Sequence, residues 1–320
     1  MIGCRYQPTK RSPDAAVSHA STALVPLDFV LEVGRATDVG GRPSNEDAVL
    51  ATALAPATGA TEPVFLLAVA DGMGGHADGE VASRLAIETL AETIGTDPGP
   101  DAEAAFRQAF RRANDAIHAK GAEAGSDRAM GTTLVAALVR GKHAAIASVG
   151  DSRAYLVRAN GLTQITKDHT LVAEEVAKGR LKADEARTSP QRNVLTHALG
   201  SRARLESKLP PVYELTLLPD DRLLLCSDGF YDVLTNADMI AAMVGRPAQE
   251  SAQLLVDLAK ERGTSDNVSA VVLEATPTRV SVAPAPLPSG RGGPSPAMIA
   301  IAALVVLALL AVAYLLLVPH

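Results

Sequence analysis

Four aspartates of this sequence stand at the ends of short apolar runs, where a strand would bring a carboxylate to the edge of a sheet. They are Asp71, Asp151, Asp228 and Asp266. Asp71 follows the run at residues 64–70 and enters a glycine-rich turn, and a single Asp-Gly step after a strand is more often a turn than a ligand. The pattern recurs, however, and no adjacent cation explains each acid as an ion pair. Grouped carboxylate oxygens of this kind favour a site for hard divalent cations.

A second group of candidate residues occupies a polar loop at residues 38–47. Arg42 is followed there by the acids Glu46 and Asp47. A guanidinium can bind a planar or tetrahedral oxyanion through two parallel hydrogen bonds, and neighbouring acids can hold metal-bound water. The alternative is a solvated turn whose arginine pairs with its own acids.

The composition limits the classes of protein to which the chain can belong. The 320 residues carry a net charge of −6, and no long basic stripe with interleaved aromatics is present, which argues against nucleic-acid binding. Aromatic residues are only 3% of the chain and Trp is absent, so the core must be aliphatic. The two cysteines, Cys4 and Cys226, form neither a disulfide framework nor a zinc site, and Cys226 is expected to be a small core residue.

The elements that must position these side chains follow from the hydrophobic pattern. Amphipathic helices are predicted at residues 78–94 and 101–120, where they would cover one face of a sheet. From residue 130 onward, apolar runs and turn signals alternate at short spacing, which indicates an antiparallel meander rather than a parallel, doubly wound sheet. A polar insertion at 167–211, with short helices at 171–178 and 183–187, is expected to select substrates or gate access. Strands resume after the insertion, and helices are predicted at 236–244 and 247–262.

Four segments of different composition follow one another along the chain. Residues 1–28 are expected to be a disordered leader, 29–276 the folded domain, and 277–296 a flexible linker rich in Pro, Gly and Ser. Residues 297–318 form an uncharged apolar run that as a helix would measure about 33 Å, enough to cross a hydrocarbon layer of about 30 Å. We therefore expect a single membrane-spanning anchor. The leader lacks the apolar segment of a secretory signal, and Arg291 precedes the anchor, so the folded domain is expected on the cytoplasmic side of the cell membrane.

Six motifs of the folded part carry a resemblance to a known family. They are RPSNED at 42–47, DGMGGH at 71–76, GTT at 131–133, GDSR at 150–153, SDG at 227–229 and DNV at 266–268. In order and approximate spacing they resemble the metal-dependent serine/threonine protein phosphatases of the PPM (PP2C-type) family in its bacterial form. The resemblance implies an α+β fold, a four-layer α-β-β-α sandwich of two antiparallel sheets flanked by helices, with two metal ions in the cleft between the sheet edges.

The resemblance also implies roles for the candidate residues. Asp71 would bridge two Mn²⁺ or Mg²⁺ ions, and the carbonyl of Gly72 would bind the second. Asp228 and Asp266 would complete the ligands of the first ion. The remaining implied roles are a third metal at Asp151 together with Asp228, water-mediated metal contacts at Glu46 and Asp47, and phosphate binding at Arg42.

The implied function is a membrane-tethered protein phosphatase that hydrolyses phosphoserine and phosphothreonine with a water activated between two divalent metals. No cysteine lies in a phosphate-binding loop, which argues against a phosphocysteine intermediate. Met73 stands where eukaryotic relatives have a histidine proposed as the general acid, so that role is unassigned. Expected partners are phosphoproteins, including a serine/threonine kinase or its substrates. Two alternatives are a pseudophosphatase that binds phosphoproteins without cleaving them and a regulator dedicated to one phosphoprotein, such as an anti-sigma antagonist.

Overall fold

The structure is a computed structural model that describes residues 29–54, 62–74, 77–95, 99–124, 130–278 and 295–317. The chain divides into two compact units, Met1–Thr278 and Arg279–His320. The expected leader and most of the expected linker, like His76 of the glycine-rich turn, lie outside the described residues.

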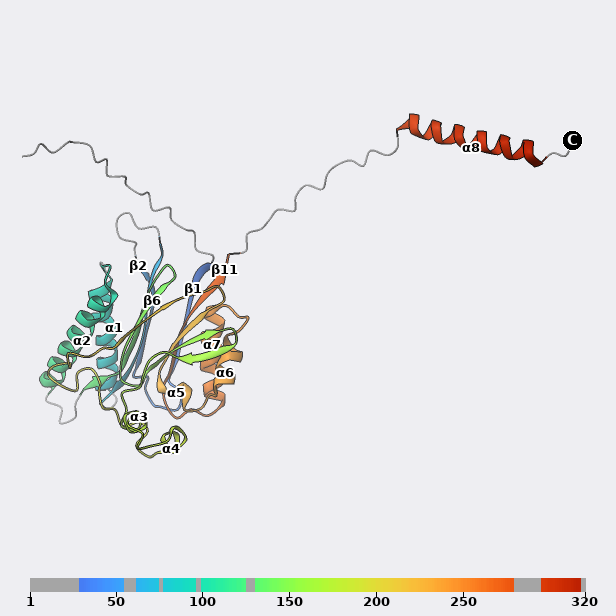
Figure 1. The fold of residues 1–320 in the computed structure, drawn as a ribbon. Helices are drawn as coiled ribbons and strands as arrows, with labels where there is room; N and C mark the ends of the chain where they lie inside the picture. Colours follow the sequence, from blue (N-terminus) through green and yellow to red (C-terminus); the bar gives the residue numbers. More distant parts are fainter. Residues whose placement is uncertain are drawn as a thin grey trace, which may run out of the picture. The chain divides into compact units, whose positions relative to one another are not determined.

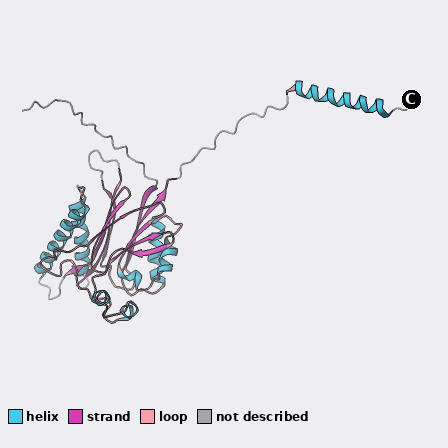
Figure 2. Cartoon of the chain, in the orientation of Figure 1, coloured by secondary structure: helices cyan, strands magenta, loops and turns pink. Residues whose placement is uncertain are grey.

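Two antiparallel sheets form the centre of the first unit, as Figures 1 and 2 show. One sheet has the strand order β1 (Phe29–Asp38), β11 (Val268–Pro277), β10 (Arg222–Cys226), β7 (Arg153–Arg158), β8 (Gly161–Gln164). The other has the order β2 (Asp47–Leu54), β3 (Val64–Met73), β5 (Leu134–Arg140), β6 (His143–Val149), β9 (Val212–Thr216), and the short β4 (Gly131–Thr132) pairs with β3. Every recorded strand pair in both sheets is antiparallel.

Helices cover the outer face of each sheet. Figure 1 shows α1 (Ala77–Ile94) and α2 (Ala102–Ala124) beside the sheet that contains β3, and α6 (Asn236–Met243) and α7 (Ala248–Glu261) beside the other sheet. The one-turn α5 (Asp228–Tyr231) follows β10, while α3 (Leu171–Ala177) and α4 (Ala183–Thr188) lie in the predicted insertion. The predicted sandwich of two helix-flanked antiparallel sheets is confirmed.

The burial pattern of β3 explains its unbroken apolar sequence. Leu66 and Ala68 pack into the core beneath α1 and α2, whereas Leu67 and Val69 pack between the two sheets against side chains of the other sheet such as Leu225. A strand with both faces buried must be apolar at every position, because successive side chains point to opposite faces. The one acid that ends this run therefore stands out.

Most predicted element boundaries are confirmed to within one or two residues, but α2 is longer than predicted. It continues through Gly121 to Ala124 instead of ending at Lys120. A Cβ at Gly121 would lie 3.2 Å from the Cβ of Met130, so this glycine allows close packing and does not stop the helix.

The second unit contains α8 (Pro296–Leu317), which coincides with most of the predicted apolar segment at 297–318. Large apolar side chains of this helix from Met298 to Leu310 are exposed, and the side chains beyond residue 311 are outside the described part. Within the residues that the structure describes, no helix has the length and hydropathy required to cross a membrane. The expected transmembrane helix is therefore not confirmed.

Candidate metal centre

The register of β2 against β3 sets two of the predicted acids opposite each other. Asp47 pairs with Asp71 in this antiparallel ladder. Like charges directly opposite across two strands repel each other, so the pair is stable only if a proton or a cation compensates them. Asp71 lies inside β3, which continues to Met73, and not at the start of the turn as predicted.

The backbone of Asp71 is fixed by the two threonines of the GTT motif. The Asp71 N–H donates to Thr133 Oγ1 at 3.0 Å, and the Thr133 N–H donates to the Asp71 carbonyl at 2.8 Å. Thr132 Oγ1 also donates to the Asp71 carbonyl, at 2.8 Å. These hydroxyls hold the backbone that carries the acid.

Asp228 comes from the other sheet, at the first position of α5. Its neighbour Ser227 donates from Oγ to Asp47 Oδ2 at 2.8 Å, which links the ends of the two sheets. Burial and the nearby charges of Asp266 and Asp232 raise the pKa of Asp228 to about 6. Burial and the charges of Asp228 and Asp266 raise the pKa of Asp47 to about 7, against the effect of its hydroxyl donors.

Asp151 is buried between the sheet ends and the insertion. Burial and the charges of Asp228 and Asp168 raise the pKa of Asp151 to about 8. The Tyr231 hydroxyl donates to the Asp151 carbonyl at 3.0 Å. The guanidinium of Arg153 lies over the Tyr231 ring in a cation–π contact, with its Cζ 3.4 Å from the ring centroid.

Arg153 also connects this side of the site to the insertion. Its Nε and Nη2 donate to the Asp168 carboxylate at 3.0 and 2.6 Å, the two-pronged geometry that favours strong arginine–carboxylate pairs. Asp168 therefore neutralises the arginine of the GDSR motif, and the Asp151 carboxyl is not recorded as its ion-pair partner.

Arg42 pairs with an acid far away in the sequence. Its Nη2 lies 2.6 Å from Asp266 Oδ2, and the arginine side chain remains 52% exposed. Sequence reasoning foresaw neither this pair nor a cation for Asp266. The hydrogen bond to Asp266 raises the pKa of Arg42, and the charges of Glu46 and Asp71 act in the same direction.

The charges of the other four aspartates act on Asp71. Burial together with the charges of Asp47, Asp228, Asp151 and Asp266 raises the pKa of Asp71 well above its usual range. No group of three Asp, Glu, His or Cys side chains among the described residues has an arrangement that could hold a metal ion as it stands. The acids are therefore electrostatic neighbours, while their roles as metal ligands stay predictions.

The chemistry of this donor set fits hard divalent cations. Asp47 Oδ1 and Asp228 Oδ1 are buried and have no hydrogen-bond partner among the described residues. Buried carboxylate oxygens without a partner are costly, and Mg²⁺ and Mn²⁺ prefer oxygen ligands of this type. The residues present thus fit the metals that the resemblance implies.

Close backbone approaches place Glu46 and Gly72 at the same end of the sheet. The Gly72 N–H donates to the Glu46 carbonyl at 3.1 Å. A Cβ at Gly72 would lie 2.0 Å from the carbonyl oxygen of Gly79, so glycine is required at this position.

Sequence reasoning missed the role of Asn267, which follows Asp266. Its Nδ2 donates to the carbonyls of Val39 and Ser44, both at 2.9 Å, and its Oδ1 accepts the Glu46 N–H at 2.9 Å. This buried amide therefore ties the Arg42 loop to the start of β11. The sequence shows only that an amide follows Asp266 in the DNV motif. Its partners lie more than 200 residues away, and nothing in the local sequence identifies them.

His169 of the insertion is a structural residue. Its ring Nδ1 accepts the Gly150 N–H at 3.1 Å, and the backbone N–H of His169 donates to the Gly150 carbonyl at 2.9 Å. Burial and the ring of His197 lower the pKa of His169 to about 4. The imidazole is consequently neutral at pH 7, and it fastens the insertion to the turn before Asp151.

Comparison with known proteins identifies the family. The family model described as protein phosphatase 2C matches residues 38–268. The chain belongs to the protein phosphatase 2C family. This match confirms the resemblance drawn from the six motifs, and it includes every predicted site residue.

Relatives of this family have both similar sequences and similar structures. The serine/threonine protein phosphatase PstP of Mycobacterium tuberculosis is 41% identical over 249 residues, which cover 78% of this chain and 46% of that protein. The chain thus spans about half the length of that relative. The serine/threonine phosphatase stp of Listeria welshimeri is 34% identical and is covered over 84% of its length, with 67% of this chain aligned.

Solved structures show the same fold. The crystal structure of the M. tuberculosis phosphatase PstP/Ppp superposes with a TM-score of 0.69 at 40% identity, covering 78% of this chain and all of that one. A structure of the PstP catalytic domain in complex with two manganese ions gives a TM-score of 0.67 at 38% identity, covering 78% of this chain and 99% of that one. A relative of known structure therefore binds two manganese ions on this fold.

Proposed function

We propose that this chain is a metal-dependent phosphatase that hydrolyses phosphoserine and phosphothreonine in proteins. The observation that carries the proposal is the group of mutually repelling, desolvated aspartates beside the half-exposed guanidinium of Arg42. Relatives named as serine/threonine phosphatases, one of them in complex with two manganese ions, support the reaction and the cofactor.

The family resemblance suggests how the acids divide the metal-binding task. We infer that Asp71 would contact both ions, that the Gly72 carbonyl would contact one, and that Asp228 and Asp266 would contact the other. Asp151 with Asp228 would hold a third ion, and Glu46 and Asp47 would bind metal-bound waters. When bound, such ions lower the pKa of a coordinated water and offset the charge of a phosphate.

Arg42 is proposed to bind the phosphoryl group. Its side chain is half exposed and uses Nη2 to contact Asp266, and a planar guanidinium has further N–H donors in a fixed geometry. With Asp266 engaged as a metal ligand, that carboxylate would no longer hold the Arg42 guanidinium by an ion pair. It can then form two parallel hydrogen bonds with phosphate oxygens next to the acids.

The backbone around these groups is held by several side-chain hydrogen bonds, which favours catalysis over binding alone. Thr132 and Thr133 hold Asp71, Ser227 holds Asp47, and Asn267 holds the Arg42 loop. Orientation of reacting groups by a preorganised site contributes several kcal/mol to catalysis, on the order of 7–11 in favourable cases. All of the acids expected from the family are present, which argues against a pseudophosphatase.

A substitution at Asp228 tests the proposal. Asp228→Ala is expected to abolish Mn²⁺-dependent release of phosphate from a phosphothreonine peptide while the circular-dichroism spectrum stays unchanged. Asp257→Ala, which removes an equal charge from the outer side of α7, is the matched control and should retain full activity. Unchanged turnover in the purified Asp228 variant would refute the assignment, and a folded wild type without turnover at any Mn²⁺ concentration would favour the pseudophosphatase.

We propose also that the C-terminal segment attaches the phosphatase to the cell membrane with its catalytic domain in the cytoplasm. The support is the sequence, which has no charged residue from 297 to 318. The tether would raise the local concentration of membrane-bound phosphoproteins, including serine/threonine kinases and their substrates. Deleting residues 298–320 should move the protein from the membrane fraction to the soluble fraction and leave peptide turnover unchanged. A full-length chain that is soluble without detergent would contradict the tether.

A further inference from the structure

A loop at residues 200–208 runs along one face of α2. Asn114 is the buried centre of this contact: its Oδ1 accepts the Gly200 N–H at 3.0 Å and its Nδ2 donates to the Arg202 carbonyl at 3.1 Å. Two turns earlier on the helix, Arg107 Nη1 donates to the Ser207 carbonyl at 2.9 Å. The loop and the helix therefore form one continuous surface.

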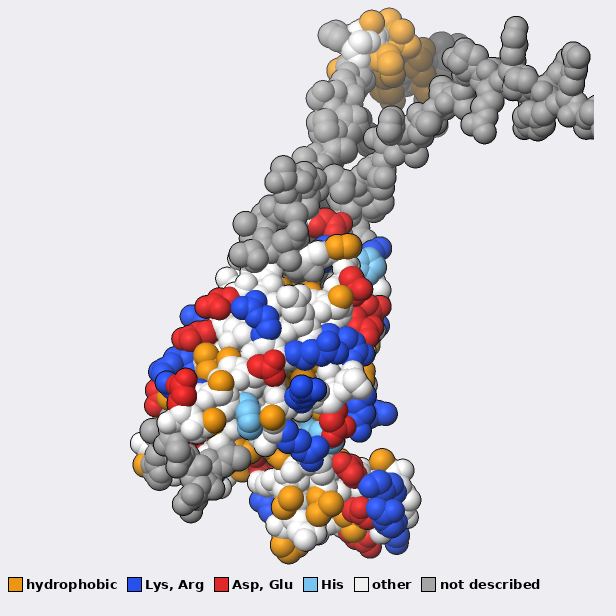
Figure 3. Space-filling view, turned by 90° about the vertical axis from the view of Figure 1, so that its left-hand side faces the viewer, with side chains coloured by type: hydrophobic (Ala, Val, Ile, Leu, Met, Phe, Trp, Pro, Cys, Tyr) orange, Lys and Arg blue, Asp and Glu red, His pale blue; other side chains and the backbone are white. Residues whose placement is uncertain are grey.

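This surface is rich in cations. Arg111 lies one turn after Arg107 and three residues before Asn114, so it projects from the same helix face as two residues that contact the loop. Five side chains form what we call the α2–loop basic patch: Arg107, Arg111, Arg202, Arg204 and Lys208. Figure 3, which views the α2 side of the molecule, shows Lys and Arg side chains across the middle of this face, with Asp and Glu side chains between and beside them.

The patch has more cations than local partners. Glu103 pairs with Arg107 at 2.7 Å, and Glu206 pairs with both Arg202 and Lys208, at 3.0 and 3.1 Å. Neither Arg111 nor Arg204 has a recorded hydrogen bond or ion pair of its side chain with any described residue.

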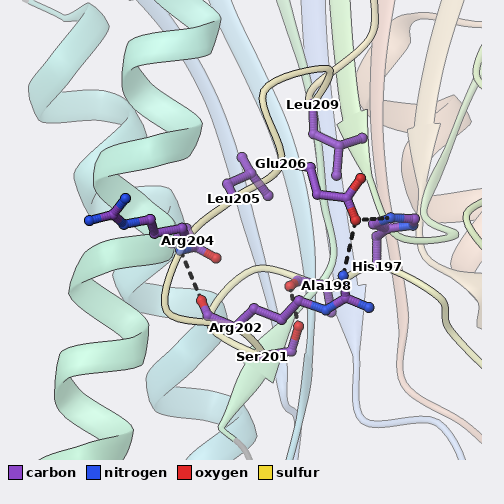
Figure 4. Close-up of a pocket in the computed structure, with 9 residues that line it drawn as sticks. His197, Ala198, Ser201, Arg202, Arg204, Leu205, Glu206 and Leu209 are labelled. Carbon is purple, nitrogen blue, oxygen red and sulfur yellow. Dashed lines mark hydrogen bonds and ion pairs between the residues drawn. The ribbon is translucent and has the colours of Figure 1, made fainter.

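The direction of the side chains agrees with this pairing. Figure 4 shows Arg202 reaching toward Glu206, while the guanidinium of Arg204 points away from that acid, on the side of α2. The pocket between them encloses only about 10 Å³, which is room for about one water. Since the whole chain carries a net charge of −6, an excess of guanidinium groups at one place needs an explanation.

The patch is adjacent to the strand that carries Asp71. Leu199, which precedes the loop, exchanges two backbone hydrogen bonds with Thr132, at 3.1 and 2.9 Å. Thr132 in turn donates from Oγ1 to the Asp71 carbonyl. A polypeptide whose phosphorylated residue lies at the aspartates can therefore reach the patch with its flanking residues.

We propose that the α2–loop basic patch binds an acidic segment, rich in Asp and Glu, of the phosphoprotein substrate. The inference rests on the proposed phosphatase function and adds a substrate class to it. Guanidinium groups bind carboxylates with two parallel hydrogen bonds. Arg111 and Arg204, which have no side-chain partner among the described residues, would not have to leave another acid of the described part to bind one. Glu103 and Glu206 lie within the patch and would repel a broad anionic lipid surface, whereas a narrow peptide can pass between them.

The test compares two variants on two peptides. Arg111→Ala/Arg204→Ala removes the two unpartnered guanidinium groups, and Arg112→Ala removes an exposed charge from the neighbouring position of α2 outside the patch. The substrates are a phosphothreonine peptide flanked by Asp and Glu, the same peptide flanked by Ser and Gly, and p-nitrophenyl phosphate. We expect the double variant to raise KM for the acidic peptide about ten-fold, as two charge-assisted contacts predict. Its kcat on that peptide, and both constants on the other substrates, should be unchanged, and Arg112→Ala should match the wild type.

Three results would overturn the proposal. The first is a double variant whose KM for the acidic peptide is unchanged. The second is a double variant whose KM rises equally for both peptides. The third is a double variant whose KM is unchanged but which no longer binds phosphatidylserine vesicles, a result that would assign the patch to lipid. Fluorescence anisotropy with the unphosphorylated acidic peptide separates this proposal from the phosphatase assignment. A wild type without turnover would refute the phosphatase assignment. Even then, peptide binding that is present in the wild type and lost in the double variant would support the patch. Peptide binding that is absent, or equal in both proteins, would refute the patch.

Discussion

Asn267→Ala is expected to loosen the loop that carries Arg42. The buried amide of Asn267 satisfies the carbonyls of Val39 and Ser44 and the N–H of Glu46, each at 2.9 Å. Alanine removes all three bonds at once and provides no substitute. The loop then loses its connection to the start of β11, and with it the position of the guanidinium proposed to bind phosphate.

The size of the effect follows from the number of bonds. Loss of three hydrogen bonds, each contributing about 1 kcal/mol, should lower the free energy of unfolding by about 3 kcal/mol. For a domain of this size that corresponds to a fall in Tm of about 6–12 °C. Displacement of a substrate-binding group by about 1 Å lowers kcat/KM by about 100-fold. Differential scanning fluorimetry and steady-state hydrolysis of p-nitrophenyl phosphate with Mn²⁺ measure the two quantities.

Asn114→Ala is the matched control, because Asn114 is also a buried amide that fastens a loop, here the one at residues 200–208. Its loss should lower Tm by a similar amount and leave kcat/KM on the small substrate unchanged. Equal losses of kcat/KM in both variants would refute the reasoning, since they would show a general effect of instability. An Asn267 variant with wild-type Tm would refute it as well.

Three further predictions concern pH, the insertion and the metal. Because the pKa of His169 is lowered to about 4, an unfolded chain takes up a proton below about pH 6.5 that the folded chain does not. The contribution of His169 to the free energy of unfolding should therefore fall as pH drops from 7 toward 4, opposite in sign to that of the aspartates whose pKa is raised. His169→Gln keeps an acceptor for the Gly150 N–H but lacks this contribution, so its stability should change differently with pH; slopes identical to the wild type in urea titrations would contradict this. Arg153→Lys loses the two-pronged contact with Asp168 and should lower the free energy of unfolding by about 1–3 kcal/mol, whereas an unchanged urea midpoint would speak against that contact. Mn²⁺ should raise the Tm of the wild type and not of Asp71→Asn, and an equal rise in both would show that the ions bind elsewhere.

The sheets and their helices could be predicted because their signals are local. The apolar run before Asp71 indicates a strand buried on both faces, and the spacing of Phe106 and Phe110 indicates a helix face. The acids could be recognised for a similar reason, since a single carboxylate at the end of such a run is conspicuous. Their assembly in one place came from the family resemblance, which the family match supports.

The contacts between distant segments could not be predicted from the sequence. Arg42 has acids four and five residues away, and local reasoning favours those, yet it pairs with Asp266. The amide of Asn267 likewise bonds to carbonyls that carry no side-chain signal at all. Such pairs are decided by the meeting of β1 and β11 in one sheet, which the sequence pattern alone does not determine.

Diffraction at the manganese absorption edge from crystals soaked in Mn²⁺ tests the central claim most directly. We expect two anomalous peaks that share the Asp71 carboxylate, with Asp228 and Asp266 as ligands of one of them. Arg42 should then have left Asp266. Crystals without manganese at Asp71, or with manganese bound only at other residues, would contradict the account.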